Sequence, residues 1–299
     1  MRRWISVGAR GMLAAALCGA MALWLCGDVA GVAAPGSMTR FAQSERDRQQ
    51  VDVQLVLAVY ISYSMDMDEL ATQREGYAEA ITSREFLQAL RQGPTGRIAI
   101  TYFEWAGMYD QKIIIPWRLV DGPESAEAVA TEIARTPVRR ASRTSISAAI
   151  DYSVGLLEQS EFAGLRKVID VSGDGANNQG VVVTQARDAA LAKGIVINGL
   201  PIMMKQLSYA TMDIPDLDIY FERCVTGGPG SFVLAIKERA KFKEAIRHKL
   251  LMEVAGRMPE PNIAPHIVPA SVQGGGPRAN VDCMIGEKVW HERWGGSRP

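Results

Sequence analysis

The chain has 299 residues, with 33 lysines and arginines against 33 aspartates and glutamates, and 47% of its residues are hydrophobic. This composition is typical of a folded protein and excludes disorder of the whole chain. The formal net charge of zero gives no reason to expect binding to nucleic acid or to an anionic membrane through bulk electrostatics. Four cysteines are too few for a disulfide scaffold, and three widely separated histidines do not predict a zinc site.

The first 34 residues have the order of a secretory signal peptide. Three arginines precede the apolar run 12–26, and small residues follow it up to Pro35. The run has about 15 residues, fewer than the roughly 20 that span a bilayer. We therefore expect residues 1–34 to be a cleaved signal and the mature protein to be periplasmic or secreted. An uncleaved signal that anchors the chain to the membrane is the alternative.

Strand and helix patterns alternate between residues 50 and 256. Continuous apolar or β-branched runs predict strands, and apolar residues at helical spacing predict helices. In chain order we expect a strand at 54–61, two helices within 68–91, strands at 97–105 and 111–120, helices at 125–135 and 145–159, a strand at 167–172, a helix at 181–193, a strand at 195–201, a short helix at 216–224, a strand at 231–236 and a helix at 238–255.

This alternation predicts one α/β domain over residues 50–256. Its sheet would be doubly wound and mostly parallel, with helices on both faces. Pro116 argues for an edge position of the strand 111–120, which fits one antiparallel edge strand. Thr82 with Glu85 predicts a capping box between the first two helices.

Residues 257–299 form a tail rich in proline and glycine, for which we expect an extended or disordered structure. Docking of Trp290 and Trp294 on the domain or on a partner is the alternative to a loosely ordered tail. Export would allow a disulfide between Cys224 and Cys283, and two free thiols are the other outcome.

The loops after the strands carry most of the hydroxyl and carboxylate groups that could form a site. Ser62 and Ser64 follow the first strand, Thr144 precedes a helix, and Asp174 follows the strand 167–172. Ligands of doubly wound folds bind at the carboxyl ends of the strands. Hydroxyl and carboxylate oxygens suit Mg²⁺ or Mn²⁺. Turn and capping chemistry alone also accounts for serine and threonine at such places.

Ser62-Tyr63-Ser64, Thr144 and Asp174 resemble the three parts of the metal-ion-dependent adhesion site of von Willebrand factor type A domains. In that family Asp-x-Ser-x-Ser is followed by a threonine and an aspartate on separate loops. The chain also resembles a group of uncharacterised exported bacterial proteins of unknown function. The segments that carry this second resemblance are 97–107, 140–151, 168–180, 224–230 and 282–288.

The first resemblance implies that Ser62, Ser64 and Thr144 contact a metal ion directly and that Asp174 holds its water molecules. It further implies that the open position of the metal takes an acidic side chain of a partner protein. Tyr60, however, stands where the family has the first aspartate of the motif. Loss of such an outer carboxylate typically weakens metal binding by about 10–100-fold.

Two neighbouring aspartates bear on this loss. Asp66 or Asp68 could compensate for the missing carboxylate, whereas the plain alternative is that both begin a helix, where acids are favoured.

We therefore expect an exported protein-binding module with a degenerate metal site. A metal-independent scaffold or interaction domain is the alternative. A hydrolase is disfavoured because the chain has no G-x-S-x-G elbow and His248 is expected at the wrong end of the sheet. Dinucleotide and P-loop motifs are missing as well, so we predict no catalytic residues.

Overall fold

The computed structural model describes residues 48–204, 214–256, 267–269 and 281–294. All of these residues belong to one compact unit, Ser44–Pro299. The signal peptide expected at residues 1–34 lies outside the described residues. No helix within the described ranges is long and apolar enough to cross a membrane.

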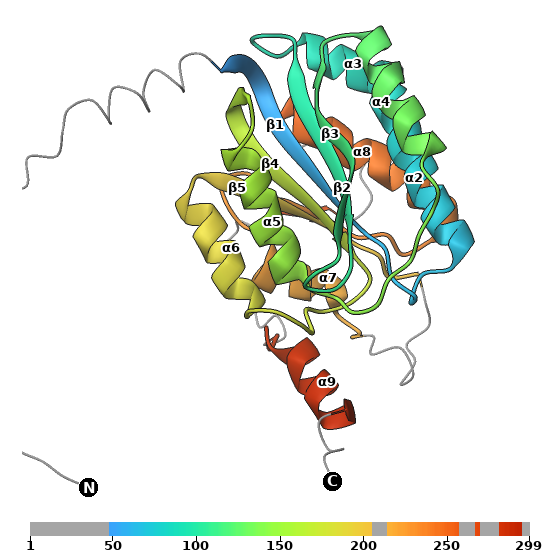
Figure 1. Ribbon diagram of the computed structural model, residues 1–299, viewed down its shortest axis with the longest axis vertical. Coiled ribbons are helices and arrows are strands. Elements are labelled where there is room, and N and C mark those ends of the chain that lie inside the picture. The colour runs from blue at the N-terminus through green and yellow to red at the C-terminus, as the bar shows by residue number, and fades with distance from the viewer. Residues whose placement is uncertain (1–47, 205–213, 257–266, 270–280, 295–299) are drawn as a thin grey trace, which may run out of the picture. The chain divides into compact units, whose positions relative to one another are not determined.

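A seven-stranded sheet forms the centre of the domain (Figure 1). Its strands, in spatial order, are β3 (Gln111–Val120), β2 (Ile98–Trp105), β1 (Gln49–Tyr60), β4 (Phe162–Gly173), β5 (Ile195–Pro201), β6 (Phe232–Leu234) and β7 (Ile267–Pro269). The central strands are parallel, whereas β3 and β7 run antiparallel to their neighbours. The predicted doubly wound sheet and its antiparallel strand at one edge are confirmed. The second antiparallel strand, β7, comes from the segment for which we expected a loose tail.

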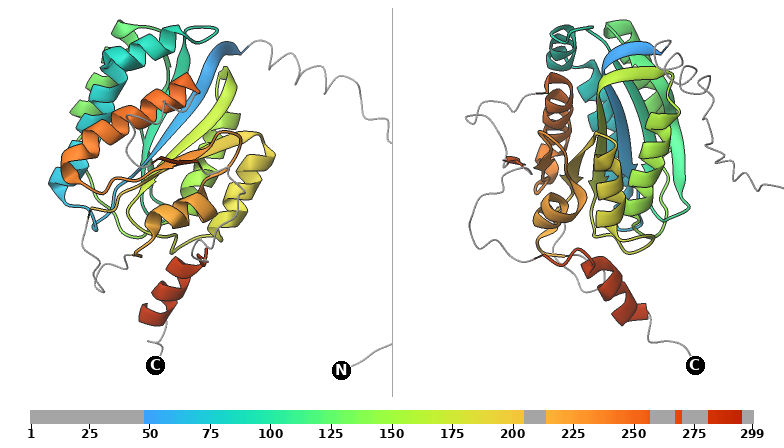
Figure 2. Two further views of the ribbon diagram at one scale, coloured as in Figure 1. Left: turned by 180° about the vertical axis from the view of Figure 1, so that it is seen from behind. Right: turned by 90° about the vertical axis from the view of Figure 1, so that its left-hand side faces the viewer.

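Helices cover both faces of the sheet. They are α2 (Met67–Thr82), α3 (Arg84–Arg91), α4 (Pro123–Arg135), α5 (Ile146–Glu158), α6 (Val183–Ala192), α7 (Leu217–Tyr220), α8 (Phe242–Ala255) and α9 (Ile285–Trp294). Figure 2 shows α8 on one side of the sheet and α5 with α6 on the other. Helix α2 packs against α8, and α5 packs against α6, β1 and β4. The chain reverses its direction across the sheet beside β1, so the loops after β1 and β4 meet at one edge.

Burial explains why these segments form these elements. Every residue of β1 from Val51 onward is buried, as an apolar strand between two helix layers requires. The periodic apolar face of α5 is buried along its whole length. Pro116, which cannot donate a ladder hydrogen bond, lies on the edge strand β3 at an irregularity in the pairing with β2.

Three local predictions need correction. Ser83, not Thr82, caps α3, because its hydroxyl accepts from the backbone amide of Phe86 at 3.2 Å. Strand β4 begins at Phe162, because its partly exposed first half pairs with the start of β1 and so needs no continuous apolar run. The tail residues 285–294 form helix α9 rather than an extended segment.

Candidate functional site

The residues predicted to form the metal site meet at the carboxyl edge of the sheet. Tyr60 ends β1, Ser62 and Ser64 follow it, Thr144 lies just before α5, and Asp174 follows β4. The structure brings these five residues together around the phenol of Tyr60. The hydroxyls of Ser62, Ser64 and Thr144 and the charge of Asp174 all act on that phenol. The predicted set is therefore one cluster.

Backbone pairing holds the two serine- and threonine-bearing loops side by side. Ser62 forms an isolated parallel bridge with Ala141, and the backbone amide of Tyr63 donates to the carbonyl of Ala141 at 3.1 Å. The amide of Ser145 donates to the carbonyl of Ala106, 2.8 Å away. These contacts fix the loops after β1, β2 and before α5 relative to one another.

The phenol of Tyr60 lies inside this cluster. The side chain is 1% exposed, and its ring centre lies 4.8 Å from that of Trp105. Its hydroxyl oxygen lies 2.6 Å from Thr144 Oγ1, a short hydrogen bond between two buried groups. The backbone of Tyr60 is fixed as well, because its amide donates to Ser172 Oγ and its carbonyl accepts from Gln73 Nε2, both at 3.0 Å.

The environment of Tyr60 keeps the phenol neutral. Burial raises its pKa well above the ordinary value, and the negative charge of Asp174 raises this pKa further. The hydroxyls of Ser62, Thr144 and Ser64 act in the opposite direction without reversing the shift. The side chain at this position therefore carries no negative charge at physiological pH.

The cluster does not fit a divalent metal ion. Mg²⁺ requires about six oxygens at roughly 2.0–2.1 Å, and its protein ligands normally include carboxylates. Here the hydroxyl of Thr144 is hydrogen-bonded to the phenol, and Asp174 is the one carboxylate that acts on the phenol. No group of three or more Cys, His, Asp and Glu side chains that could hold a metal ion occurs within the described ranges.

Asp66 is engaged elsewhere and does not replace the missing carboxylate. It caps α2 in a reciprocal capping box with Glu69. Its other carboxylate oxygen lies 2.6 Å from Arg239. The backbone hydrogen bond from Glu69 and the charge of Arg239 lower the pKa of Asp66. The contacts thus agree with the alternative in which this acid begins a helix.

Two asparagines that the sequence analysis did not single out tie the cluster together. Asn178 Oδ1 accepts from the amide of Thr144 at 3.0 Å, and the amide of Asn178 donates to the carbonyl of Thr144 at 2.8 Å. Asn177 Oδ1 accepts from the amide of Ser147 at 3.0 Å. Their signal in the sequence is a pair of amides directly after the loop that holds Asp174 and Gly175.

The outer surface of these loops combines aromatic rings with arginines. Tyr63 is 63% exposed, and the guanidinium of Arg140 lies 5.2 Å from the centre of its ring. The guanidinium of Arg143 lies 3.3 Å from the ring centre of Trp290 in α9. Trp290 therefore docks on the domain.

Cys224 and Cys283 form a disulfide, so of the two outcomes that the sequence left open, the structure has the disulfide and not two free thiols.

A second cluster of ionisable groups is buried between β4 and α8. Asp170 Oδ1 lies 2.9 Å from Lys249 Nζ, which in turn lies 2.6 Å from Glu253 Oε1. All three side chains are at most 1% exposed. Burial raises the pKa of Asp170 to about 7, although the ammonium of Lys249 opposes this effect. Because solvent does not reach these groups, we interpret the cluster as structural.

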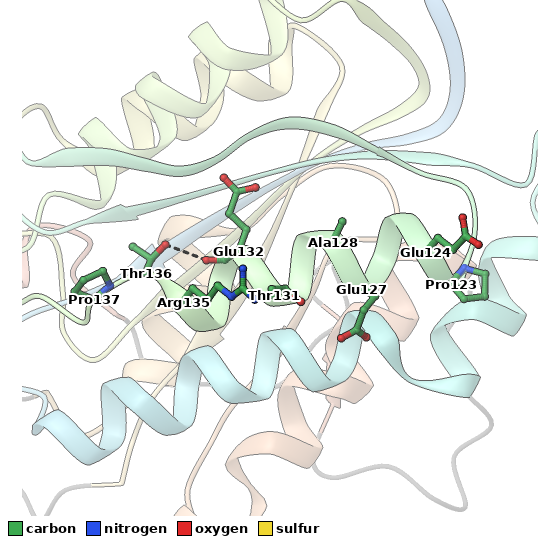
Figure 3. A pocket seen from close by; sticks show the side chains of 9 residues that line it. All are labelled: Pro123, Glu124, Glu127, Ala128, Thr131, Glu132, Arg135, Thr136 and Pro137. Carbon is green, nitrogen blue, oxygen red and sulfur yellow. Dashed lines mark hydrogen bonds between the residues drawn. The ribbon is translucent and has the colours of Figure 1, made fainter.

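Figure 3 shows the side chains that line an open groove along α4. Its walls include Glu124, Glu127, Glu132 and Arg135. None of the predicted site residues lines this groove. We assign no ligand to it.

Comparison with known families identifies the domain. Residues 50–258 match the sequence profile of a family described as protein of unknown function (DUF1194). No curated protein matches the chain.

Among solved structures, the chain is similar to proximal thread matrix protein 1 from the mussel byssus, with 11% identity and a TM-score of 0.51 over 70% of this chain and 49% of that chain. It is similar to the pilus adhesin SpaC from Lactobacillus rhamnosus GG, with 11% identity and a TM-score of 0.51 over 70% and 31%. A von Willebrand factor type A structure from Catenulispora acidiphila also matches, with 12% identity and a TM-score of 0.47 over 69% and 43%.

The chain thus spans about half, or less, of the length of these proteins. At such low identities the likeness shows the fold alone. The α/β fold with a mostly parallel sheet, which the sequence predicted, is thus shared with the first two of these structures.

Proposed function

The chain belongs to a family of proteins of unknown function, DUF1194, and we propose that it is an exported protein-binding module that works without a bound metal ion. The observation that carries the proposal is the 2.6 Å contact between the Tyr60 hydroxyl and Thr144 Oγ1. This contact joins two loops directly where the resemblance implies a metal ion. The edge of the sheet is thereby held in shape by hydrogen bonds.

The surface above this contact has the chemistry of a protein interface. Tyrosine and arginine are enriched at the energetic centres of such interfaces. Tyr63 protrudes from the edge beside Arg140, and Met67 nearby in the sequence is 46% exposed. A partner would contact Tyr63 and Arg140 first, over loops that the buried cluster keeps rigid.

Two features support an exported location. The N-terminal sequence has the order of a signal peptide. Cys224 and Cys283 form a disulfide, and disulfides are typical of proteins in oxidising compartments, because the cytosol keeps most thiols reduced. Both features point to the periplasm or the outside of the cell.

Site-specific photo-crosslinking tests the proposal. A benzophenone amino acid replaces Tyr63 in the full chain expressed in its own host. The matched control places the same group at Leu165, which is 62% exposed against 63% for Tyr63 but lies in the first half of β4, far from its carboxyl end. We expect a discrete crosslinked protein from position 63, unchanged by EDTA, and none from position 165.

Two results would count against the proposal. Crosslinking at position 63 that disappears with EDTA would mean that the edge binds its partner through a metal. Equal or no crosslinking at the two positions would leave the edge with no special role in binding and favour a scaffold.

A further inference from the structure

The C-terminal helix α9 lies against the loops that carry Thr144 and Asp174. The Cys224–Cys283 disulfide anchors the chain two residues before the helix, with the Cα atoms 5.4 Å apart. Asn177 Nδ2 donates to Glu287 Oε1 at 2.7 Å. The Arg143 guanidinium stacks on the Trp290 ring. Figure 1 shows α9 at the end of the sheet where β1 and β4 finish.

The approach between α9 and the Asp174 loop is too close for an additional side chain. A Cβ atom on Gly286 would lie 2.1 Å from the carbonyl oxygen of Asn177. Glycine at this position therefore allows the helix backbone to touch the loop backbone. The contact is specific, because it depends on one glycine and on the one amide side chain that also holds the start of α5.

Arg143 has an unusual backbone at this contact. Its φ is 79°, which makes it the one residue other than glycine with positive φ within the described ranges. Such a conformation is costly for a side chain with a Cβ and persists where the surroundings impose it. Arg143 directly precedes Thr144, and its carbonyl accepts a 3.4 Å hydrogen bond from the Tyr60 hydroxyl. The residue that meets Trp290 is thus part of the loop that forms the buried cluster.

Helix α9 has little stability of its own. It has ten residues, and isolated helices shorter than about 12–15 residues are marginal in water. Gly286 is its only fully buried residue, and its first residue, Ile285, packs partly buried against the core. The helix is held by the disulfide and by the contacts of Ile285, Gly286, Glu287 and Trp290.

We propose that α9 is an intramolecular occupant of the partner-binding edge, kept there by the Cys224–Cys283 disulfide. This proposal rests on the proposed function, because it takes the edge as the place where a partner binds. The partner that displaces α9 is a helical segment with an acidic residue and an aromatic residue three positions apart, as in Glu287 and Trp290. An external dithiol that reduces the disulfide, and is itself oxidised to a disulfide, favours this exchange. It leaves Cys224 and Cys283 as thiols and so frees α9 to leave Arg143 and Asn177.

A peptide-binding experiment tests this occupancy. The full chain with Cys224→Ser, Cys283→Ser and Trp290→Ala carries a weakened, untethered α9. The probe is a fluorescent peptide of residues 281–294 with Cys283→Ser. We expect saturable binding, measured by fluorescence anisotropy. The oxidised natural chain should bind at least tenfold more weakly, because its own tethered helix competes at roughly millimolar effective concentration.

Matched controls locate the contact. Arg143→Ala in the untethered chain should reduce peptide binding at least tenfold. Arg118→Ala should not, because Arg118 lies on β3 opposite Ile100 and pairs with Glu132. A peptide with Trp290→Ala should bind the untethered chain as weakly as the unchanged peptide binds the Arg143→Ala variant. Circular dichroism verifies that each variant is folded. Peptide that fails to bind the folded untethered chain, or that binds the oxidised natural chain equally well, overturns the proposal.

Hydrogen exchange on the natural chain gives a second measurement. Reduction should lower the protection of the amides near Thr144 and Asn177 while the central strands stay protected. Unchanged protection in that loop after reduction contradicts the tether. Peptide binding without crosslinking at position 63 would uphold the occupancy by α9 and reject the proposed function. Crosslinking without peptide binding would do the reverse.

Discussion

Tyr60 differs in size, charge and acidity from the aspartate that the family resemblance implies at its position. The phenol side chain is longer than that of aspartate. Its oxygen therefore lies among the hydroxyls of Ser62, Ser64 and Thr144. Its pKa is raised by burial and by Asp174, so it remains a neutral hydrogen-bonding group. A single substitution thereby accounts for both the loss of charge and the filling of the site.

We predict that Tyr60→Asp creates a metal site. The change removes the phenol and restores a carboxylate next to Ser62, Ser64 and Thr144. Calorimetric titration with Mg²⁺ and Mn²⁺ should show saturable heat for Tyr60→Asp and none for the natural chain.

Two variants control this titration. Tyr60→Asn removes the same bulk without adding charge and should not bind. Asp174→Ala in the Tyr60→Asp background should weaken binding by about 10–100-fold. Saturable binding by the natural chain that Asp174→Ala abolishes would show that the phenol does not exclude the metal.

Strand β4 and helix α8 share the buried cluster of Asp170, Lys249 and Glu253. The pKa of Tyr77 in α2 is raised by burial and, further, by the charges of Asp170 and Glu253. The phenol of Tyr77 is therefore a neighbour of this cluster. One ammonium group between two buried carboxylates leaves the cluster with an excess of acid. Desolvation by burial raises the pKa of Asp170 most, and the charge of Glu253 raises it further.

The cluster predicts a stability that falls as pH rises. The pKa of Asp170 is about 7 in the folded protein against an ordinary 3.8, so the folded state holds this proton more tightly than the unfolded state. The contribution of this proton to the free energy of unfolding is complete below about pH 4 and is lost as pH rises through about 7. The free energy of unfolding should therefore decrease between these values, by about 2–4 kcal/mol from this group.

Urea denaturation at about pH 4.5 and about pH 7.5 measures this decrease. Asp170→Asn keeps the shape of the side chain and removes its titration, so its free energy of unfolding should change less between the two pH values. Parallel pH profiles for the natural chain and Asp170→Asn would mean that Asp170 is already ionised in the folded state.

At the scale of the whole molecule, the disulfide joins two parts of the chain that are far apart in the sequence. Cys224 lies in the core between α7 and β6, whereas Cys283 leads into α9, and the two cysteines are 59 positions apart in the sequence. The bridge therefore closes a loop that contains β6, α8 and β7. Closing such a loop restricts the unfolded chain.

We predict that Cys224→Ser with Cys283→Ser lowers the free energy of unfolding by about 2–4 kcal/mol. The slope of the urea transition should rise, because the unfolded chain exposes more surface without the bridge. Equilibrium denaturation followed by circular dichroism compares this variant with the oxidised natural chain. Identical transitions would show that the bridge is not formed in the purified protein.

Much of the fold followed from local patterns. Strands β3 and β5 have the predicted bounds, and the order of strands and helices is the predicted one. Apolar periodicity is a local property, so a sequence expresses it wherever an element is buried on one or both faces. Strand β7 and helix α9 were not predicted, because their short sequences lie among prolines and glycines. Both elements depend on contacts with the domain.

The candidate site was predictable as a set of residues but not as chemistry. Ser62, Ser64 and Asp174 stand after strands that the sequence identified, and the parallel sheet brings such positions to one edge. Thr144 stands just before a helix that the sequence also identified. The sequence also showed that Tyr60 replaces a carboxylate. It did not show where the phenol points, or that Asn177 and Asn178 join the loops.

The sequence by itself determined the α/β architecture, the loops that meet at the carboxyl edge and the residue types in them. Only the tertiary structure decided that the Tyr60 phenol bonds Thr144, 84 positions away, that Cys224 pairs with Cys283 and that α9 contacts Arg143. The physical reason is that periodicity and propensity act between near neighbours. A hydrogen bond or a disulfide instead requires two distant side chains to meet within a few ångströms, and only the packed chain fixes that distance.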